Sequence, residues 1–367
     1  MKHILKSPVA KAIIGLLIGI VLLFLVSRIV NIVASFDIVV KNLTTPHGIV
    51  LALLSGVVFL LAYSLRGLRW KLFLGSITTI KASTAIRVYL IGVFVNFLFS
   101  LSSGEIAKTL ILKRSAGTPI SRSLPTVAMD RSLDLLPSLV IMIIVPLLGM
   151  HMEIRLWIVL GMVGGLFVGL AAFIGLTVWN RNVAISLLGK IIGILPKAIG
   201  GKIQAFVTGF VEALIASASR PRIFLPAMAL TCLAVMCDAL FATLAFWIVG
   251  LPISYGTVIF GYTIFNLFYI LPNPPGQVGS NEAVGLLVFA GLLHLPPDRV
   301  IAMHIFTHLW AALTMCVTAL VCLNSLGLKI PTTLGIKAQP EESKEMPLSE
   351  ESKEMPLSEE VEASVLR

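Results

Sequence analysis

The sequence predicts an all-α polytopic membrane protein with about six full spans and two re-entrant helical hairpins arranged as an inverted repeat. Of its 367 residues, 57% are hydrophobic and only 13% are charged, a composition that excludes a water-soluble domain. Residues 239–281 contain no charged side chain. Because a membrane-spanning helix needs about 20 apolar residues, this run is long enough for two passes.

The uncharged run is interrupted at residues 271–276, Leu-Pro-Asn-Pro-Pro-Gly. Proline lacks the backbone donor of a helix and clashes with the preceding turn, so a helix cannot continue through this segment. Irregular backbone at membrane depth must face protein or water. We therefore predict a re-entrant hairpin whose first half-helix ends at Leu271 and whose second runs from about Asn281 to Leu293. A loop outside the membrane between two ordinary spans is the alternative.

The full spans follow from hydropathy along the rest of the chain. They are expected at residues 12–33, 48–65, 124–150, 156–179, 223–249 and 300–326. The basic and aromatic residues 66–71 follow the second span and predict an anchor at the membrane interface. The more polar residues 34–47, which precede that span, are expected to form a loop.

Another hairpin is predicted earlier in the chain. The apolar residues 84–101 stop at residues 102–105, Ser-Ser-Gly-Glu, and Lys81 and Lys108 stand on either side of the segment. Basic residues gather on the cytoplasmic side of membrane proteins. We therefore expect both ends of the segment on that side, so that the chain enters the membrane and returns.

The distribution of basic residues predicts the orientation. Most basic residues of the predicted loops lie on one side of the membrane, whereas Lys41, Arg155 and Arg299 lie on the other. This bias predicts that both termini are cytoplasmic in a multi-pass protein of the cell inner (plasma) membrane. The net charge of +10 is accounted for by these loops and does not indicate nucleic-acid binding.

A single membrane domain is expected over residues 1–328. Its halves cover about residues 10–150 and 155–328, and residues 181–222 form an amphipathic cytoplasmic linker. Residues 329–367 form an acidic tail in which the nine-residue sequence EESKEMPLS occurs twice in tandem. The tail has too few apolar residues to form a core, so we predict that it is disordered.

The two predicted hairpins are similar in sequence. Residues 92–96, Gly-Val-Phe-Val-Asn, parallel residues 261–266, Gly-Tyr-Thr-Ile-Phe-Asn, and each stretch leads to a tip that ends in glutamate. Asp130 and Asp134 then occupy places in the first half that correspond to His304 and His308 in the second. Three passes in each half give the halves opposite orientations. Inverted repeats with broken helices at their interface are typical of transporters.

Four segments in order carry a family resemblance. They are residues 68–70 (Leu-Arg-Trp), 103–108 (Ser-Gly-Glu-Ile-Ala-Lys), 129–136 (Met-Asp-Arg-Ser-Leu-Asp-Leu-Leu) and 274–282 (Pro-Pro-Gly-Gln-Val-Gly-Ser-Asn-Glu). Over about residues 10–326 the chain resembles the flippase-like membrane domain of bacterial lysylphosphatidylglycerol synthases, the multiple peptide resistance factor family. It departs from that pattern at residues 101–103, Leu-Ser-Ser, where relatives often carry a proline.

The resemblance implies a role in moving modified phospholipids between leaflets. Full synthases add a soluble aminoacyl-transferase domain, for which we find no counterpart after the last predicted span. The resemblance therefore implies a stand-alone form that is not an enzyme.

Charged and polar groups inside a membrane are costly and are candidates for function. No catalytic residue, metal or cofactor is predicted. The carboxylates among the intramembrane groups outnumber the arginines, which favours a cationic head group or proton coupling. The candidate substrate-binding residues are Arg87, Asn96, Glu105, Asp130, Arg131, Asp134, Asp238, Asn266, Asn273, Glu282, His304 and His308.

Each of these candidates also has a structural interpretation. Arg131 lies three residues before Asp134, so it either forms an ion pair there, or ties its span to a hairpin, or holds a lipid phosphate. Arg87 is the other candidate for the phosphate. Glu105 and Glu282 stand at predicted helix starts, where a carboxylate is favoured by the helix dipole.

The two histidines have a spacing compatible with a metal, but no third ligand accompanies them. A polar pair or a proton-sensitive element is the favoured interpretation of His304 and His308.

The function predicted from the sequence is lipid translocation of the flippase or scramblase type. A phospholipid or lipid-linked head group would pass through a polar groove between the two hairpins, and membrane lipids rather than nucleic acids would be the partners. The alternative is a membrane-embedded enzyme or accessory factor of lipid or lipid-linked glycan metabolism. The sequence leaves the lipid, the direction, the energy source and the oligomeric state open.

Overall fold

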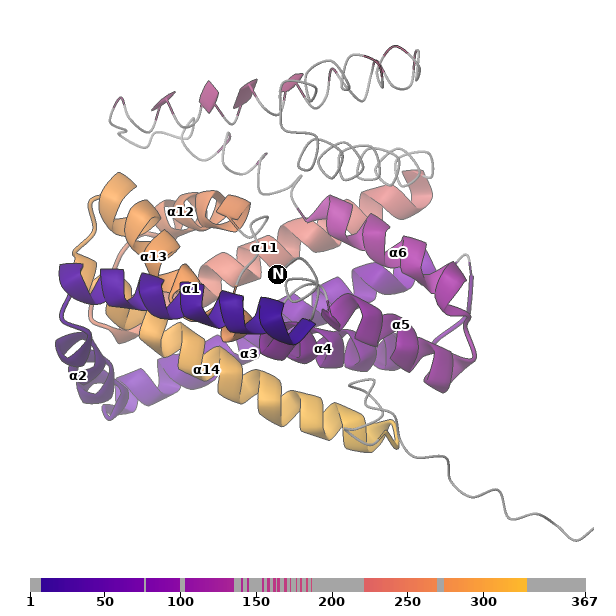
Figure 1. The fold of residues 1–367 in the computed structure, drawn as a ribbon, viewed down its shortest axis with the longest axis horizontal. Helices are drawn as coiled ribbons and strands as arrows, with labels where there is room; N and C mark the ends of the chain where they lie inside the picture. Colours follow the sequence, from indigo (N-terminus) through magenta and orange to yellow (C-terminus); the bar gives the residue numbers. More distant parts are fainter. Residues whose placement is uncertain are drawn as a thin grey trace, which may run out of the picture.

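The computed structural model of the protein describes residues 8–75, 77–99, 103–134, 221–268 and 274–328, together with single positions between residues 140 and 186 (Figure 1). The described residues form ten α-helices and no strand. Four of these helices are long and apolar enough to cross a membrane, or up to five if one bent pair counts as a span. The predicted class, an all-α polytopic membrane protein, is therefore confirmed.

The chain begins with a bent pair of helices. Helix α1 (Pro8–Ile29) and helix α2 (Ile32–Leu43) meet at 84°. The Asn31 side chain starts α2 by accepting a hydrogen bond from the Ala34 amide at 3.1 Å. The prediction of a loop over residues 34–47 was wrong, because α2 buries Val39 against the bundle while Asp37 stays on the exposed face.

Helices α3 and α11 pack against each other near the centre of the bundle. Helix α11 (Pro221–Ile248) matches the span predicted at residues 223–249. Helix α3 (Pro46–Leu74) begins at a Thr45 cap and continues beyond the end predicted for its span at Leu65. The basic residues that suggested a membrane interface lie within this helix and not at its end, and Arg69 among them is completely buried.

The first hairpin consists of helix α4 (Ala82–Phe99) and helix α5 (Ser103–Ala116), which pack side by side. Gly92 and Gly104 make this close packing possible, because a Cβ on Gly104 would overlap the Gly92 carbonyl oxygen. Helix α6 (Ile120–Leu133) follows. The remainder of the span predicted at residues 124–150, the span at 156–179, the linker at 181–222 and the tail lie outside the continuously described residues.

The second hairpin is interrupted at its tip as the prolines predict. Helix α12 (Tyr255–Leu267) ends before the predicted Leu271, and residues 269–273 lie outside the described residues. A short 3₁₀ turn, η3 (Pro275–Gln277), precedes helix α13 (Ser280–Gly285). Gly276 and Gly279 adopt φ values of 67° and 80°, which glycine adopts without steric strain.

Helix α13 continues directly into the π-helical segment η4 (Leu286–Leu292), and the long helix α14 (Pro297–Ser325) closes the described fold. In the second hairpin Gly261 has the same role as Gly92 in the first, because a Cβ there would clash with the ring of Phe289 on η4. The glycines that the two hairpins share in sequence thus both lie at the helix crossing.

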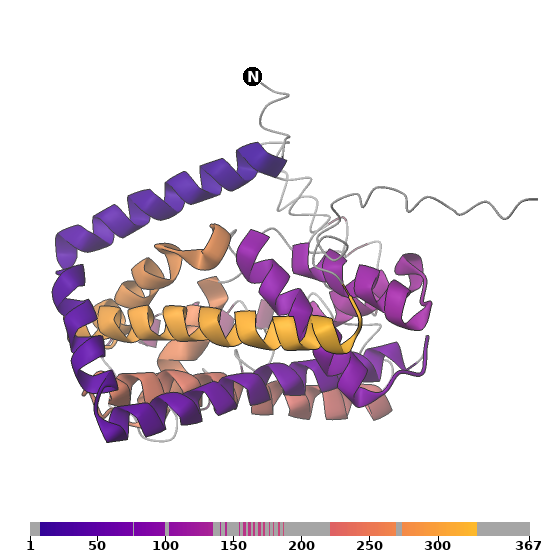
Figure 2. The same ribbon diagram turned by 90° about the horizontal axis from the view of Figure 1, so that it is seen from below.

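The two hairpins occupy opposite ends of the molecule. Helices α4 and α5 lie on the right of Figure 1 and α12 and α13 on the left. Near the middle of the molecule, α4 of the first hairpin contacts η3, the turn at the tip of the second hairpin. In Figure 2 helix α1 extends as an arm along the outside, and it touches the second tip, where Gly19 meets Gly279. The opposite orientation of the hairpins, the inverted repeat and the number of full spans remain predictions.

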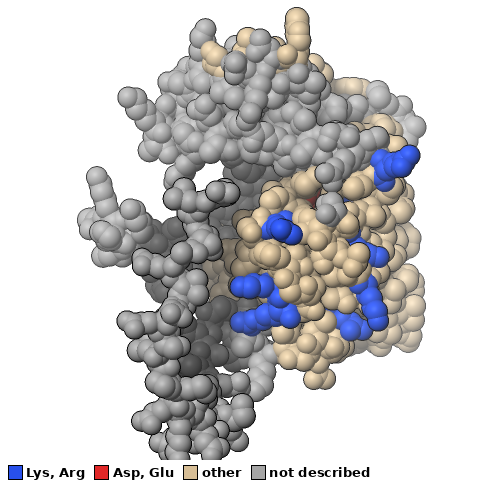
Figure 3. All heavy atoms as spheres, turned by 90° about the vertical axis from the view of Figure 1, so that its right-hand side faces the viewer, with Lys and Arg blue, Asp and Glu red and all other residues tan. Residues whose placement is uncertain are grey.

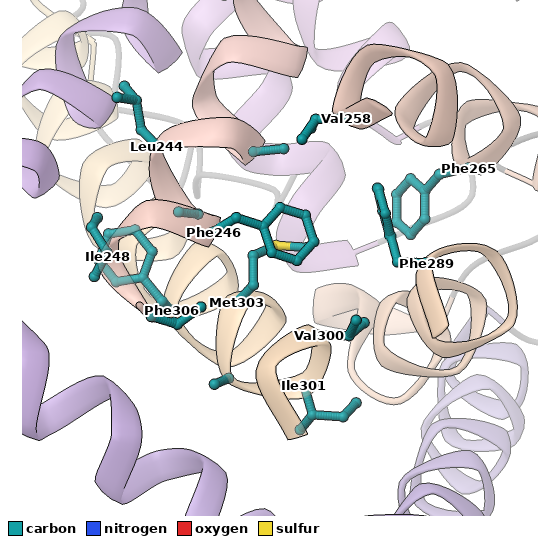
Figure 4. Packing of buried hydrophobic residues seen from close by; sticks show 14 of the residues in the cluster. Leu244, Phe246, Ile248, Val258, Phe265, Phe289, Val300, Ile301, Met303 and Phe306 are labelled. Atoms are coloured by element: carbon teal, nitrogen blue, oxygen red, sulfur yellow. The ribbon is translucent and has the colours of Figure 1, made fainter. Parts of the chain in front are cut away.

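Apolar packing forms two large clusters, and each of them includes residues from both halves of the chain. The larger one joins α11, α12, η4 and α14, where the rings of Phe246 and Phe289 meet edge to face at 5.2 Å beside Met303 (Figure 4). The other joins α3, α4 and α5 around Trp70 and Tyr89. These clusters hold the polar side chains of the next section in fixed positions.

The end of the bundle near α5 and α6 is basic. Figure 3 shows this face with several separate Lys and Arg side chains among uncharged residues. Lys81, Lys113, Arg114 and Arg122 are all exposed, and all belong to the predicted cytoplasmic loops. The membrane side that this face meets stays a prediction.

Candidate functional site

Arg69 is the centre of a buried ion-pair network. Its Nε donates to Asp130 Oδ1 at 2.7 Å and its Nη1 donates to Asp134 Oδ1 at 2.6 Å. Nη1 also donates to the hydroxyl of Thr231 on α11 at 3.0 Å. One guanidinium thereby joins α3, α6 and α11 inside an apolar bundle, where an unpaired charge would be very costly.

Glu105, in the first turn of α5, joins two cations. Arg131 on α6 donates to Glu105 Oε1 through Nε at 2.8 Å and also through Nη2. Lys108 Nζ lies 2.6 Å from Glu105 Oε2. The Lys108 ammonium also lies 4.3 Å from the ring centroid of Tyr89, a cation–π distance. The expected tie between α6 and the first hairpin is therefore present.

A third pair extends the set towards α11. Arg66 donates to both carboxylate oxygens of Asp238, one of them at 3.2 Å, so this predicted site residue has a structural partner. We call the whole set the arginine–carboxylate network. It comprises the cations Arg66, Arg69, Lys108 and Arg131 and the carboxylates of Glu105, Asp130, Asp134 and Asp238.

The network is balanced in charge, and one of its cations is open to the outside. The side chain of Arg131 is 48% exposed, whereas those of Arg69 and Lys108 are 0% and 2% exposed. Asp134, which lies 3.6 Å from Arg131, is 25% exposed. An external ligand would therefore meet the network at Arg131.

A second polar set lies in the other half of the molecule. Glu282 on α13 accepts a hydrogen bond from the Gly279 amide at 2.7 Å, and so caps its helix as predicted. Its other oxygen lies 3.3 Å from His308 Nδ1 on α14. His304 lies one turn before His308 and stacks on the ring of Phe265 at 5.5 Å. We call Glu282, His304 and His308 the histidine–glutamate cluster.

The remaining sequence candidates are placed separately. Arg87 on α4 lies within electrostatic range of Cys322, far along α14 from the cluster. Asn96 is close to Gly104 of the first hairpin, and its side-chain oxygen is buried without a hydrogen-bond donor among the described residues. Asn266 lies in the last turn of α12. Asn273 lies outside the described residues.

Helix α4 of the first hairpin contacts the histidine–glutamate cluster of the second half. Phe97, near the end of α4, meets the ring of His308 edge-on at 5.8 Å. Helix α4 also contacts η3, the turn that precedes Glu282. The first hairpin thus reaches the cluster of the second.

The sequence interpretation missed the partners of the carboxylates. Arg66 and Arg69 were assigned to the membrane interface and Lys108 to a loop, but all three lie inside the fold. The signal that could have identified them is charge balance, since buried carboxylates require cationic or hydrogen-bonding partners. The three-residue spacing of Arg66 and Arg69 places both on one helix face, towards such partners.

Fold and site together define a polytopic membrane protein with two helical hairpins whose first-turn glutamates each meet the following helix. The family described as the lysylphosphatidylglycerol synthase TM region matches residues 12–322, and the chain belongs to this family. The resemblance found in the sequence is thereby confirmed, and the membership connects the chain with membrane lipids. A comparison with curated proteins found no match.

Proposed function

We propose that the protein moves a phospholipid or a lipid-linked head group from one leaflet to the other. The head group would travel along the polar side chains near the hairpin tips while the acyl chains stay in the bilayer. Broken helices near the membrane midplane are a common site for substrates in transporters. The contacts of α4 with η3 and with α14, which join the first hairpin to the turn of the second, support this route.

The observation that carries the proposal is the position of Arg131. It is the exposed cation of a network in which four cations balance four carboxylates. A planar guanidinium binds phosphate through two parallel hydrogen bonds. A lipid phosphate would replace Glu105 on Arg131, and Glu105 would keep Lys108 as its partner. Exchange of one anion for another avoids leaving a bare charge in the membrane.

The test is transfer of a fluorescent phospholipid in vesicles that contain the purified full-length protein. A membrane-impermeant reductant reports how much of the label reaches the outer leaflet. Wild-type protein should accelerate transfer over protein-free vesicles, and Arg131→Lys should slow it about tenfold, because one charge-assisted hydrogen bond contributes about 1.5 kcal/mol. Arg122→Lys, an exposed position on the same helix, is the matched control and should behave as wild type.

Two outcomes would contradict the proposal. Wild-type protein without effect on transfer would exclude translocation of the tested phospholipid, and equal rates for both lysine variants would exclude Arg131 as the phosphate ligand. A chemically altered lipid after incubation would instead favour the enzymatic alternative.

A further inference from the structure

The histidine–glutamate cluster and the arginine–carboxylate network occupy corresponding places but differ in their chemistry. In the first half Glu105 on a hairpin helix meets Arg131 on the next helix. In the second half Glu282 on a hairpin helix meets His308 on the next helix. The first glutamate therefore faces a permanently charged group, whereas the second faces an imidazole, which exists either neutral or with an added proton.

Glu282 has no lysine or arginine partner among the described residues, and its electrostatic neighbours are His304 and His308. With both imidazoles neutral, the cluster carries one negative charge. Glu282 and His304 are each only 6% exposed, and a buried charge without compensation is costly. One bound proton would make the cluster neutral.

His304 has a nitrogen available for that proton. Its Nε2 is buried and has no hydrogen-bond partner in the described part of the chain. The ring is held between Phe265 and Phe289, at 5.5 and 6.3 Å between centroids. Nε2 faces Gly285, where a Cβ would overlap it. Gly285 directly precedes the π-helical segment η4, and π-helical turns are frequent at functional sites.

Other titratable groups on the helices around α14 do not compensate the cluster. Asp37 and Lys41 of α2 are exposed, and Asp238 of α11 pairs with Arg66 of α3. Arg87 of α4 is near Cys322, which the helical rise places about 21 Å from His308. Arg69 of α3 is held by Asp130 and Asp134. Tyr262 of α12 stacks on Phe265, and Asp298 and Arg299 lie at the start of α14.

We propose that the histidine–glutamate cluster binds a proton within the membrane and releases it to the opposite side as lipid crosses, so that the proton gradient drives transfer. The proton enters from one aqueous phase onto an imidazole nitrogen, changes the charge of the cluster from −1 to zero, and leaves to the other phase. Hydronium loses the proton as the N–H bond forms, and water accepts it again when that bond breaks. This inference rests on the proposed lipid translocation, but proton movement can be measured separately.

The experiment uses vesicles that contain the full-length protein, an enclosed pH-sensitive dye and a fluorescent phospholipid, with the membrane potential clamped. An imposed pH gradient should produce a proton flux above that of protein-free vesicles, and the lipid transfer rate should follow the gradient. Glu282→Gln keeps an acceptor for the Gly279 amide, and His304→Phe keeps a ring on Phe265. Both should reduce the proton flux to the protein-free level.

His47→Gln is the matched control, because His47 is exposed at the start of α3, and it should keep the wild-type flux. Thermal melting and gel-filtration profiles establish that each variant is folded, and either cluster variant alone suffices for the test. Lipid transfer without proton flux, or equal flux in wild type and a folded cluster variant, would overturn the inference and leave the translocation proposal standing. Proton flux without lipid transfer would support the proton site and contradict translocation.

Discussion

Replacement of Arg69 by methionine tests whether the buried network holds the fold together. Methionine has a similar length but removes the donors to Asp130, Asp134 and Thr231. Asp134 keeps Arg131 nearby, at 3.6 Å. Asp130 is 0% exposed and would become a buried carboxylate without a cation. Removal of one partner from a buried ion pair destabilises proteins by about 3–5 kcal/mol. We therefore expect Arg69→Met to lower the free energy of unfolding by that amount.

A second substitution separates charge from packing. Asp130→Asn in the Arg69→Met background removes the bare charge and leaves a neutral amide, for which an unsatisfied hydrogen bond costs about 1–3 kcal/mol. About 2 kcal/mol of stability should therefore return. Unfolding in mixed micelles with increasing denaturing detergent, followed by tryptophan fluorescence, measures both changes.

Arg122→Met on the exposed face of α6 is the control, and its effect should stay within about 0.5 kcal/mol. The reasoning is refuted if Arg69→Met is as stable as this control, or if Asp130→Asn restores nothing.

Two glycine substitutions test the close packing of the hairpins. Gly104→Val should destabilise the protein by at least about 1–3 kcal/mol in the same unfolding assay, because the added atoms overlap the Gly92 backbone. Gly256→Val, in open space on α12, is the control and should cost less than about 1 kcal/mol. Equal losses of stability in the two variants would contradict close packing. Gly285→Ala should displace the His304 ring and lower the melting temperature, whereas an unchanged melting temperature would show that the ring can move away freely.

Hydropathy and proline chemistry in the sequence were sufficient to predict the class of protein. The apolar residues 223–249 and 300–326 correspond closely to α11 and α14, because a membrane span depends on local composition. The break in the second hairpin was predicted because proline acts on its own turn of backbone. The cap at Glu282 was predicted for the same reason, since a carboxylate at a helix start responds to a local dipole.

Elements with polar surfaces were harder to predict. Residues 34–47 carry Asp37 and Lys41 and suggested a loop, but α2 exposes these side chains and packs its other face on α14. The charges of Arg66 and Arg69 suggested the end of a span, but α3 continues through them. In both places the charged residues were evident in the sequence. Whether their side chains point outward or into the bundle depended on which helix packed alongside.

The sequence by itself determined that the chain is a membrane protein of this family, and it predicted broken hairpins with charged groups among the apolar helices. The tertiary structure alone decided which of these charges compensate one another. Arg69 lies 61 residues from Asp130, and Arg66 lies 172 residues from Asp238. Such pairs form because a low-dielectric interior makes separate charges costly, and no local pattern specifies the partner. The same energetic rule leaves Glu282 with two histidines, a difference between the halves that appears only when the helices are packed.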